Sequence, residues 1–160
     1  MKWTTLKSGK HAGLSLPQII LADADWFFWV YEEGFFKGRL AVEAEDLAAK
    51  ARAIKIPKHV PKNWEVEYRY EDDGRFTEFD FVEVGVPSYC GFRRIHRLSY
   101  LDLSFIRRGR TYDKQGCRYL LRCFRYHYFG DGVRLTKERC ETFFSKRRNF
   151  WRSAKATTRG

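Results

Sequence analysis

The order of apolar and polar positions predicts a helical unit at the start of the chain. Residues 9–13 have a glycine at each end and predict a tight turn. Ser15 follows the turn and can cap a helix that begins near Leu16, with Pro17 in its first turn. We therefore expect the first helix to begin directly after Ser15.

Two further helices are expected before residue 56. Asp23 or Asp25 can cap the second, which carries an aromatic run and stops near Gly34. The third is expected over residues 40–54 because its apolar residues recur at helical spacing. These apolar residues are Leu40, Ala44, Leu47, Ala48 and Ala51.

The middle of the chain follows a period of two, which is typical of β-strands. Alternation over 64–71 and the Asp-Gly pair at 73–74 predict a hairpin that returns through residues 79–82. A further strand is expected over 99–106. Its alternating apolar residues are Leu101, Leu103 and Phe105.

The last stretch returns to helical spacing. A helix is expected from Asp113 to about Phe129, and Thr136 can cap a second one. The apolar stripe of the first is Cys117, Leu120, Leu121, Phe124 and Tyr128. The core face of the second is Cys140, Phe143, Phe144 and either Phe150 or Trp151.

These elements predict an α+β fold: a small N-terminal helical module, then a short antiparallel sheet and a C-terminal helical pair. Pro57 and Pro61 bracket a linker, Ile56 to Lys62, where we place the boundary between two units. The units are a helical module at 1–56 with the turn at residues 9–13 and a basic α+β domain at 62–151. Residues 152–160 are expected to form a flexible basic tail.

The net charge of +11 is distributed unevenly along the chain. Residues 61–84 carry 3 basic and 8 acidic side chains, whereas residues 85–160 carry 19 basic and 5 acidic ones. A strongly basic segment attracts polyanions and binds them by releasing counterions. Most of these basic residues are arginine, which suits bidentate phosphate contacts and stacking on bases.

Residues 9–29 carry a motif in which glycine, lysine and tryptophan have set positions. It consists of Gly9, Lys10, Gly13, Ser15, Leu16, Asp23 and Trp29. The motif resembles the small module at the C-terminus of exodeoxyribonuclease X-like proteins, which also occurs in short bacterial and phage proteins. His11 and Ala24 depart from it, in place of an aromatic residue and a proline. The resemblance implies an accessory module in proteins that handle nucleic acid, without the separate exonuclease domain.

Basic residues interleaved with aromatic ones favour contact with a nucleic acid, either DNA or RNA. Each aromatic ring taken singly is more often core than a stacking surface. In the N-terminal turn, Lys10 suits a phosphate, although a structural turn accounts for it equally well. The candidate binding residues are Lys10, Arg93, Arg94, Arg97, Arg107, Arg108, Arg110, Lys114, Arg118, Arg122, Arg125, Lys146, Arg147 and Arg148.

Two metal sites are weighed and not favoured. Dense carboxylates suggest a metal-dependent nuclease, but on an alternating strand such acids fall on the solvent face. They are Glu65, Glu67, Asp72, Asp73, Glu78, Asp80 and Glu83. A structural zinc would need the ligands Cys90, Cys123, His127 and Cys140. Because no ligand pair has short loop spacing, we favour four reduced thiols.

We therefore expect a non-catalytic nucleic-acid-binding protein that needs no cofactor, phage-encoded or an accessory to DNA processing. The alternative is an interaction subunit or inhibitor of a nucleoprotein complex, whose acidic hairpin at 64–84 contacts a basic partner. No apolar run approaches the roughly 20 residues that span a bilayer. The start lacks the apolar core of a secretory signal. We expect a cytoplasmic protein of a bacterial or phage-infected cell, with no membrane partner and an undetermined oligomeric state.

Overall fold

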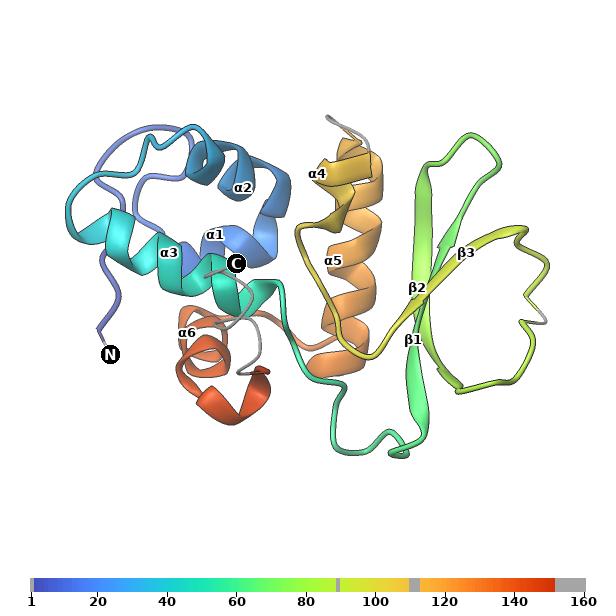
Figure 1. Cartoon of the computed structure of the whole chain (residues 1–160). Helices are drawn as coiled ribbons and strands as arrows, with labels where there is room; N and C mark the ends of the chain where they lie inside the picture. The colour runs from blue at the N-terminus through green and yellow to red at the C-terminus, as the bar shows by residue number, and fades with distance from the viewer. Residues whose placement is uncertain (1, 89, 110–112, 152–160) are drawn as a thin grey trace.

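Three short helices follow one another near the N-terminus, as the sequence predicts. The computed structural model describes residues 2–88, 90–109 and 113–151, with the backbone alone for 108 and 109. The helices are α1 (Leu16–Ala22), α2 (Ala24–Glu32) and α3 (Arg39–Ala51) (Figure 1). The Asp23 carboxylate caps α2 by accepting a hydrogen bond from the backbone N–H of Trp26 at 3.3 Å. Between the two candidates for this cap, the structure therefore selects Asp23.

A three-stranded antiparallel sheet follows, with the strand order β2-β1-β3. Strands β1 (Trp64–Tyr70) and β2 (Phe76–Glu83) form the predicted hairpin, and β3 (Arg94–Leu98) pairs with the other edge of β1. The α+β class is confirmed.

The strand expected over 99–106 is wrong. β3 ends at Leu98, and residues 105–109 form a short helix, α4 (Phe105–Gly109). The segment packs against α3 and the sheet without forming a strand, and it buries Leu101 and Leu103. The burial of these two side chains accounts for the alternating pattern of the sequence. The Asp102 carboxylate between them accepts hydrogen bonds from the backbone N–H and hydroxyl of Ser104, at 2.8 and 2.7 Å. Such local bonds favour a turn over a strand ladder.

The last two α-helices match their predicted caps. α5 (Lys114–Tyr128) begins after Asp113, and α6 (Lys137–Ser145) begins after Thr136, whose hydroxyl accepts a hydrogen bond from the backbone N–H of Arg139 at 3.2 Å. A short 3₁₀ helix, η1 (Arg147–Asn149), follows α6. Of the two alternatives for the core, Phe150 is buried and Trp151 is 45% exposed.

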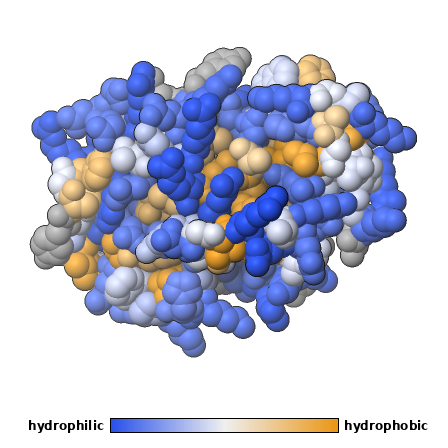
Figure 2. All heavy atoms as spheres, turned by 180° about the vertical axis from the view of Figure 1, so that it is seen from behind, coloured by the Kyte–Doolittle hydropathy of each residue, from blue (hydrophilic) through white to orange (hydrophobic). Residues whose placement is uncertain are grey.

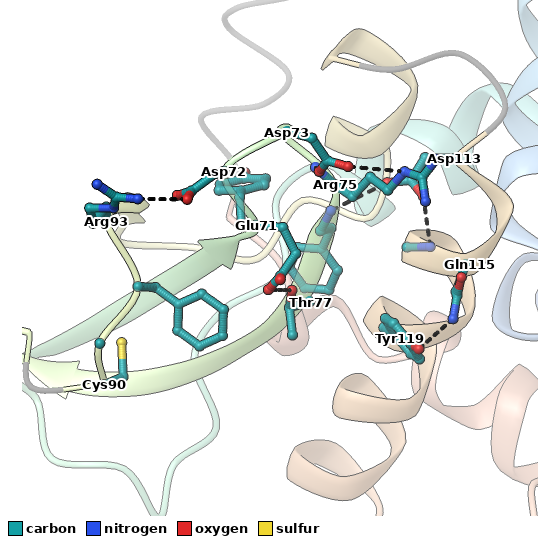
Figure 3. A pocket seen from close by; sticks show the side chains of 15 residues that line it. Glu71, Asp72, Asp73, Arg75, Thr77, Cys90, Arg93, Asp113, Gln115 and Tyr119 are labelled. Carbon is teal, nitrogen blue, oxygen red and sulfur yellow. Dashed lines mark hydrogen bonds and ion pairs between the residues drawn. The ribbon is translucent and has the colours of Figure 1, made fainter.

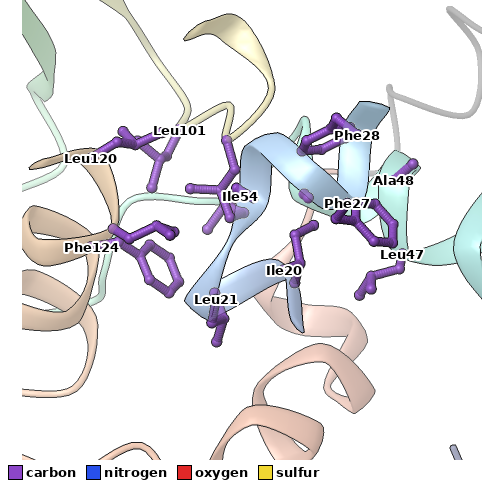
Figure 4. Packing of buried hydrophobic residues seen from close by; sticks show 14 of the residues in the cluster. Ile20, Leu21, Phe27, Phe28, Leu47, Ala48, Ile54, Leu101, Leu120 and Phe124 are labelled. Atoms are coloured by element: carbon purple, nitrogen blue, oxygen red, sulfur yellow. The ribbon is translucent and has the colours of Figure 1, made fainter. Parts of the chain in front are cut away.

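The two expected units share one hydrophobic core. Helix α6, from the end of the chain, packs against α1, and α5 stands between the other helices and the sheet (Figure 1). Ile54 pairs with both Leu101 and Phe150 through isolated β-bridges, and its side chain is fully buried. Figure 4 shows it between Leu120 and Phe124 of α5 and the apolar residues of α2 and α3. α3 ends three residues earlier than expected, so that Ile54 is free to make these contacts.

Replacing Ile54 with alanine tests whether the core is continuous. The substitution leaves a cavity where both halves meet, and we expect it to lower the free energy of unfolding by about 3 kcal/mol. Chemical denaturation followed by fluorescence and by circular dichroism should give coincident transitions in both proteins. As a control, Val42→Ala changes a side chain that is 72% exposed, and its effect should stay within about 0.5 kcal/mol. Separate transitions for helices and sheet would contradict a shared core.

Candidate nucleic-acid interface

Helix α5 carries basic side chains at successive turns and no acidic residue. We call Lys114, Arg118, Arg122 and Arg125 the α5 stripe. All four are exposed, and none of them makes an ion pair with a carboxylate within the described part of the chain. The α5 stripe is therefore a set of cations that remains available to an external anion.

Asp113 fixes the start of α5 and joins it to the sheet. Its carboxylate accepts hydrogen bonds from the backbone N–H of Gly116 at 2.9 Å and of Phe76 in β2 at 3.3 Å. A Cβ atom on residue 116 would lie 2.3 Å from Asp113 Oδ2, so glycine is what permits this close approach. The α5 stripe is thus anchored to β2 at its N-terminal end.

Two tyrosines lie among the cations of α5. Tyr126 is 58% exposed, and the Arg122 guanidinium lies 5.7 Å from the centroid of the half-buried Tyr119 ring. Tyr128 instead packs in the core, where it stacks on Phe124. The face opposite that of Figure 1 shows hydrophilic side chains on either side of a narrow apolar strip (Figure 2). Exposed charge beside exposed rings is the combination that contacts phosphates and bases.

The end of the α5 stripe lies near α6. Burial raises the pKa of the Cys140 thiol in α6 to about 11, and the positive charge of Arg125 opposes this rise. The C-terminal part of α5 packs against α6, where the ring centroids of Phe124 and Phe143 lie 5.4 Å apart. This places the stripe along the length of α5, from β2 towards α6.

The arginines on and beside β3 have hydrogen-bond or ion-pair partners within the chain. Arg93 forms an ion pair with Asp72 at 2.7 Å, and Arg94 donates to the backbone carbonyl of Asp72 at 3.0 Å. Arg97 forms an ion pair with the buried Glu67 at 2.7 Å. Arg97 is thus held by a buried carboxylate, whereas the pair of Arg93 with Asp72 lies at the surface, with the two side chains 82% and 69% exposed, and contributes little to stability.

Arg107 in α4 is also engaged. Its guanidinium lies 2.6 Å from the Asp25 carboxylate and 3.2 Å from that of Glu32, and its side chain is only 10% exposed. These bonds join α4 to α2. The side chains of Arg108 and Arg110 lie outside the described residues, so for them the sequence prediction stands alone.

Lys10 and the last three candidates are exposed at two other places. Lys10 forms an ion pair with Asp23 at 3.1 Å and lines a cleft together with Lys114 and Arg118. Lys146 and Arg148 line a second cleft, of about 960 Å³, beside α6. Arg147 is exposed next to them in η1.

The second cleft contains cations that the sequence analysis did not select. Lys55 and Lys58 enter it from the linker, and Arg139 enters it from α6. Among the described residues that line it, Glu138 is the one carboxylate. Since the linker and the lining residues between 128 and 149 are far apart in the sequence, the linker lysines gave no signal beyond their charge.

The four candidate zinc ligands do not form a site. Within residues 2–88, 90–109 and 113–151, no three His, Cys, Asp or Glu side chains are arranged to hold a metal ion. The Cys90 thiol lies 3.6 Å from a Glu67 oxygen, and Cys140 is buried in α6. His127 packs against Phe79 and Phe81, and burial lowers its pKa. Cys123 and His127 share a helix, and Asp80 of β2 lies 3.7 Å from His127 Nε2, but these described side chains are not arranged to hold a metal ion.

The carboxylates of the hairpin tip also have partners of their own. They line a cleft of about 880 Å³ between the hairpin and the first turns of α5 (Figure 3). Glu71 accepts a hydrogen bond from Thr77 at 3.0 Å, Asp72 pairs with Arg93, and Asp73 lies 3.5 Å from Arg75. Their partners hold the tip together, and among the described residues no three His, Cys, Asp or Glu side chains are arranged to hold a metal ion.

Glu67 corrects the expectation that the acids of β1 face solvent. Its side chain is fully buried and accepts hydrogen bonds from Arg69 at 2.8 Å, Arg97 at 2.7 Å and Ser88 at 2.9 Å. The segment that contains Ser88 covers this face of the sheet, which strand alternation alone does not reveal. Burial by itself raises the pKa of Glu67, but the hydrogen bonds from Arg69, Arg97 and Ser88 more than reverse this effect and leave the pKa below its ordinary value.

The Glu67 cluster makes stability depend on pH. Because the folded pKa is lowered, the contribution is complete above the ordinary pKa of 4.5 and is lost as the pH falls through the folded value. We expect Glu67→Gln to destabilise the protein by about 3 kcal/mol at pH 7, since it removes the buried carboxylate that Arg69 and Arg97 share. Arg69 keeps its ion pair with Glu78 at 2.6 Å, and Arg97 lies 3.9 Å from Glu65. Urea unfolding at several pH values should show this difference shrinking in acid. A difference that stays constant down to pH 3 would contradict the assignment.

No protein-family model matches this chain, and no curated protein or solved structure gives a significant match to it. The resemblance of residues 9–29 therefore stays a prediction. Among the described helices, none combines the length and the apolar character that crossing a membrane requires. The proposed function therefore depends on the geometry of the chain itself.

Proposed function

We propose that this chain is a non-catalytic nucleic-acid-binding protein that holds a phosphate backbone along the α5 stripe. The observation that carries the proposal is the contrast between the stripe and the other arginines. Arg97 and Arg107 lie against carboxylates, whereas the described surroundings of Arg118 and Arg122 supply none. Cations left without an internal partner are available to neutralise phosphates.

The α5 stripe costs stability in the absence of a ligand. Lys114 and Arg118 lie four residues apart, as do Arg118 and Arg122, while Arg122 and Arg125 lie three apart. Each such like-charge pair destabilises a helix by about 0.2–0.5 kcal/mol, so the three together cost about 1 kcal/mol. A polyanion laid along the helix would remove this repulsion.

The tyrosines support a nucleic acid over other polyanions. Tyr126 on α5 is 58% exposed, and Tyr119 is half-buried with one side against the core. Aromatic rings beside cations can stack on unpaired bases, and such stacking tolerates any sequence. The stripe and these rings together suit a binder that reads the backbone and the base faces.

The alternative role, in which the acidic hairpin binds a basic partner, has less support. Glu67 is buried, Asp72 is paired with Arg93, and Glu71 is bonded to Thr77. These acids would have to give up internal partners before they could contact another protein. Some acids of the hairpin are thus bound within the chain, while Glu71 and Glu83 form no ion pair with a described residue.

We expect binding to DNA and RNA to weaken steeply with salt. The logarithm of the affinity should fall linearly with the logarithm of the salt concentration, because phosphate contacts release counterions. Titrations of single- and double-stranded DNA and RNA by fluorescence anisotropy, between about 50 and 200 mM salt, give this slope. Affinity that does not change over this range would remove the proposal.

Replacing Arg118, Arg122 and Arg125 together by glutamine should weaken binding to every sequence by a similar factor. The salt slope on duplex DNA should fall by about 2.7, since each lost phosphate contact reduces it by about 0.9. The three side chains are exposed, so the fold should be retained.

The matched control removes the same formal charge elsewhere. Arg75, Arg93 and Arg94 are exposed at the hairpin tip, where Arg75 and Arg93 face carboxylates and Arg94 donates to a backbone carbonyl. Their replacement by glutamine should change the slope far less than the stripe variant does. Equal slopes for the two triple variants would show that total charge, and not the α5 stripe, governs binding.

A further inference from the structure

A cleft of about 470 Å³ opens beside the N-terminal end of the α5 stripe. It lies between the N-terminal turn, α2, α4 and the first turns of α5. Lys10 and Asp23 line it on one side, and Lys114 and Arg118 line it on the other. Its volume is within the range of pockets that hold small ligands, about 300–1,000 Å³.

The charges of this cleft are paired on one wall and unpaired on the other. On the α2 wall, Asp23 binds Lys10 at 3.1 Å, and Asp25 binds Arg107 at 2.6 Å. On the α5 wall, Lys114 and Arg118 have no carboxylate partner within the described residues. Two positive charges thus face the cleft at its α5 wall, where an incoming anion would be stabilised.

Two tryptophans of α2 form the aromatic part of the cleft. Trp26 and Trp29 lie three residues apart, which places them on neighbouring positions of one helix face. The Trp26 ring is held by an edge contact with His11, at 4.7 Å between centroids, and another with Phe36 at 6.2 Å. Trp29 remains 37% exposed. The cleft therefore offers one indole fixed by its neighbours and one that is accessible.

The mixture of groups selects a nucleotide over a bare phosphate ion. A free phosphate would be attracted by Lys114 and Arg118, but it would leave the indoles of the cleft without a contact. A nucleotide separates its two parts, so that its phosphate can lie at the cations while its base lies beside the indoles. Carboxylates accept hydrogen bonds from the amino groups of bases, which suits the α2 wall.

From this arrangement we infer that the cleft receives one unpaired base of a strand whose backbone follows the α5 stripe. The inference rests on the proposed function and narrows it to single-stranded or locally unpaired nucleic acid. A base inside a duplex is stacked and paired on its edge, so it cannot enter a cleft without leaving the helix. Lys114 and Arg118 hold the phosphate that flanks the inserted base, and Trp29 provides the stacking surface.

The test replaces Trp29 by alanine and compares two probes. A short labelled oligo(dC) single strand, whose bases carry an amino group, and a duplex of the same length are titrated against wild type and variant by fluorescence anisotropy. The variant should bind the single strand roughly tenfold more weakly, the loss expected for one stacked base, with little change for the duplex. Trp151→Ala is the matched control, since Trp151 is 45% exposed and does not line this cleft. It should leave both affinities unchanged.

The outcomes separate this inference from the proposed function. Equal losses on single strand and duplex, or no loss on either, would overturn the cleft assignment while leaving the α5 stripe in place. Wild-type protein that binds neither probe would overturn both proposals. Circular dichroism and thermal unfolding of Trp29→Ala should match wild type, because the ring is partly exposed. If that variant is destabilised, Trp29→Phe serves in its place, because it keeps a ring at this position. If stacking is the cause, Trp29→Phe should restore the single-strand affinity. Any other result would overturn the assignment.

Discussion

Helix α5 is packed on two sides at once, and this burial decides which of its side chains a ligand can reach. His127 lies against Phe79 and Phe81 of the sheet, while Leu120 and Phe124 join the core shared with the other helices. An α-helix has 3.6 residues per turn, so two buried sides leave a single outward strip. The α5 stripe and its tyrosines occupy that strip because neither of the other sides can accept a charge.

The basic residues of this protein divide according to the carboxylates within their reach. Those of β3 and α4 lie next to Asp72, Glu67 and Asp25, with which they form internal pairs. A buried pair such as Arg97 with Glu67 is costly to break, because the remaining charge has no water to replace its partner. Helix α5 has no acidic residue of its own. The net charge of the chain therefore overstates the number of cations left without an internal carboxylate, which include those of α5 and of the cleft beside α6.

The N-terminal turn and α5 meet at the cleft beside α2, although they are far apart in the sequence. Lys10, Asp23 and Trp29 belong to the motif at residues 9–29, and all three line this cleft together with Lys114 and Arg118. Asp23 holds the arrangement by capping α2 and by binding Lys10 and His11. A single acidic residue thus positions the turn relative to the tryptophans of α2. The fold thus places the motif and the stripe at the same opening, which the proposed binding of one strand requires.

The sequence by itself determined the local elements of this protein. Ser15, Asp23 and Thr136 marked helix starts, Asp-Gly at 73–74 marked the hairpin turn, and the spacing of Leu120 and Phe124 marked the buried side of α5. Such signals depend on hydrogen bonds and packing between near neighbours along the chain, so they can be found without the fold. The α5 stripe was also visible, because its cations repeat at helical spacing.

Only the tertiary structure decided which charged side chains lack an internal partner and which segments cover each face of the sheet. Alternation placed Glu67 on the outer side of β1, but the segment around Ser88 covers that side and two arginines neutralise the carboxylate. The segment at 99–106 alternated like a strand, yet its contacts with α3 and the sheet made it a turn before α4. Pairing and burial join residues that are distant in the sequence, and their free energies depend on distances that no local pattern contains. For that reason the sequence supplied the candidate arginines, and the fold separated those held internally from those that face outward.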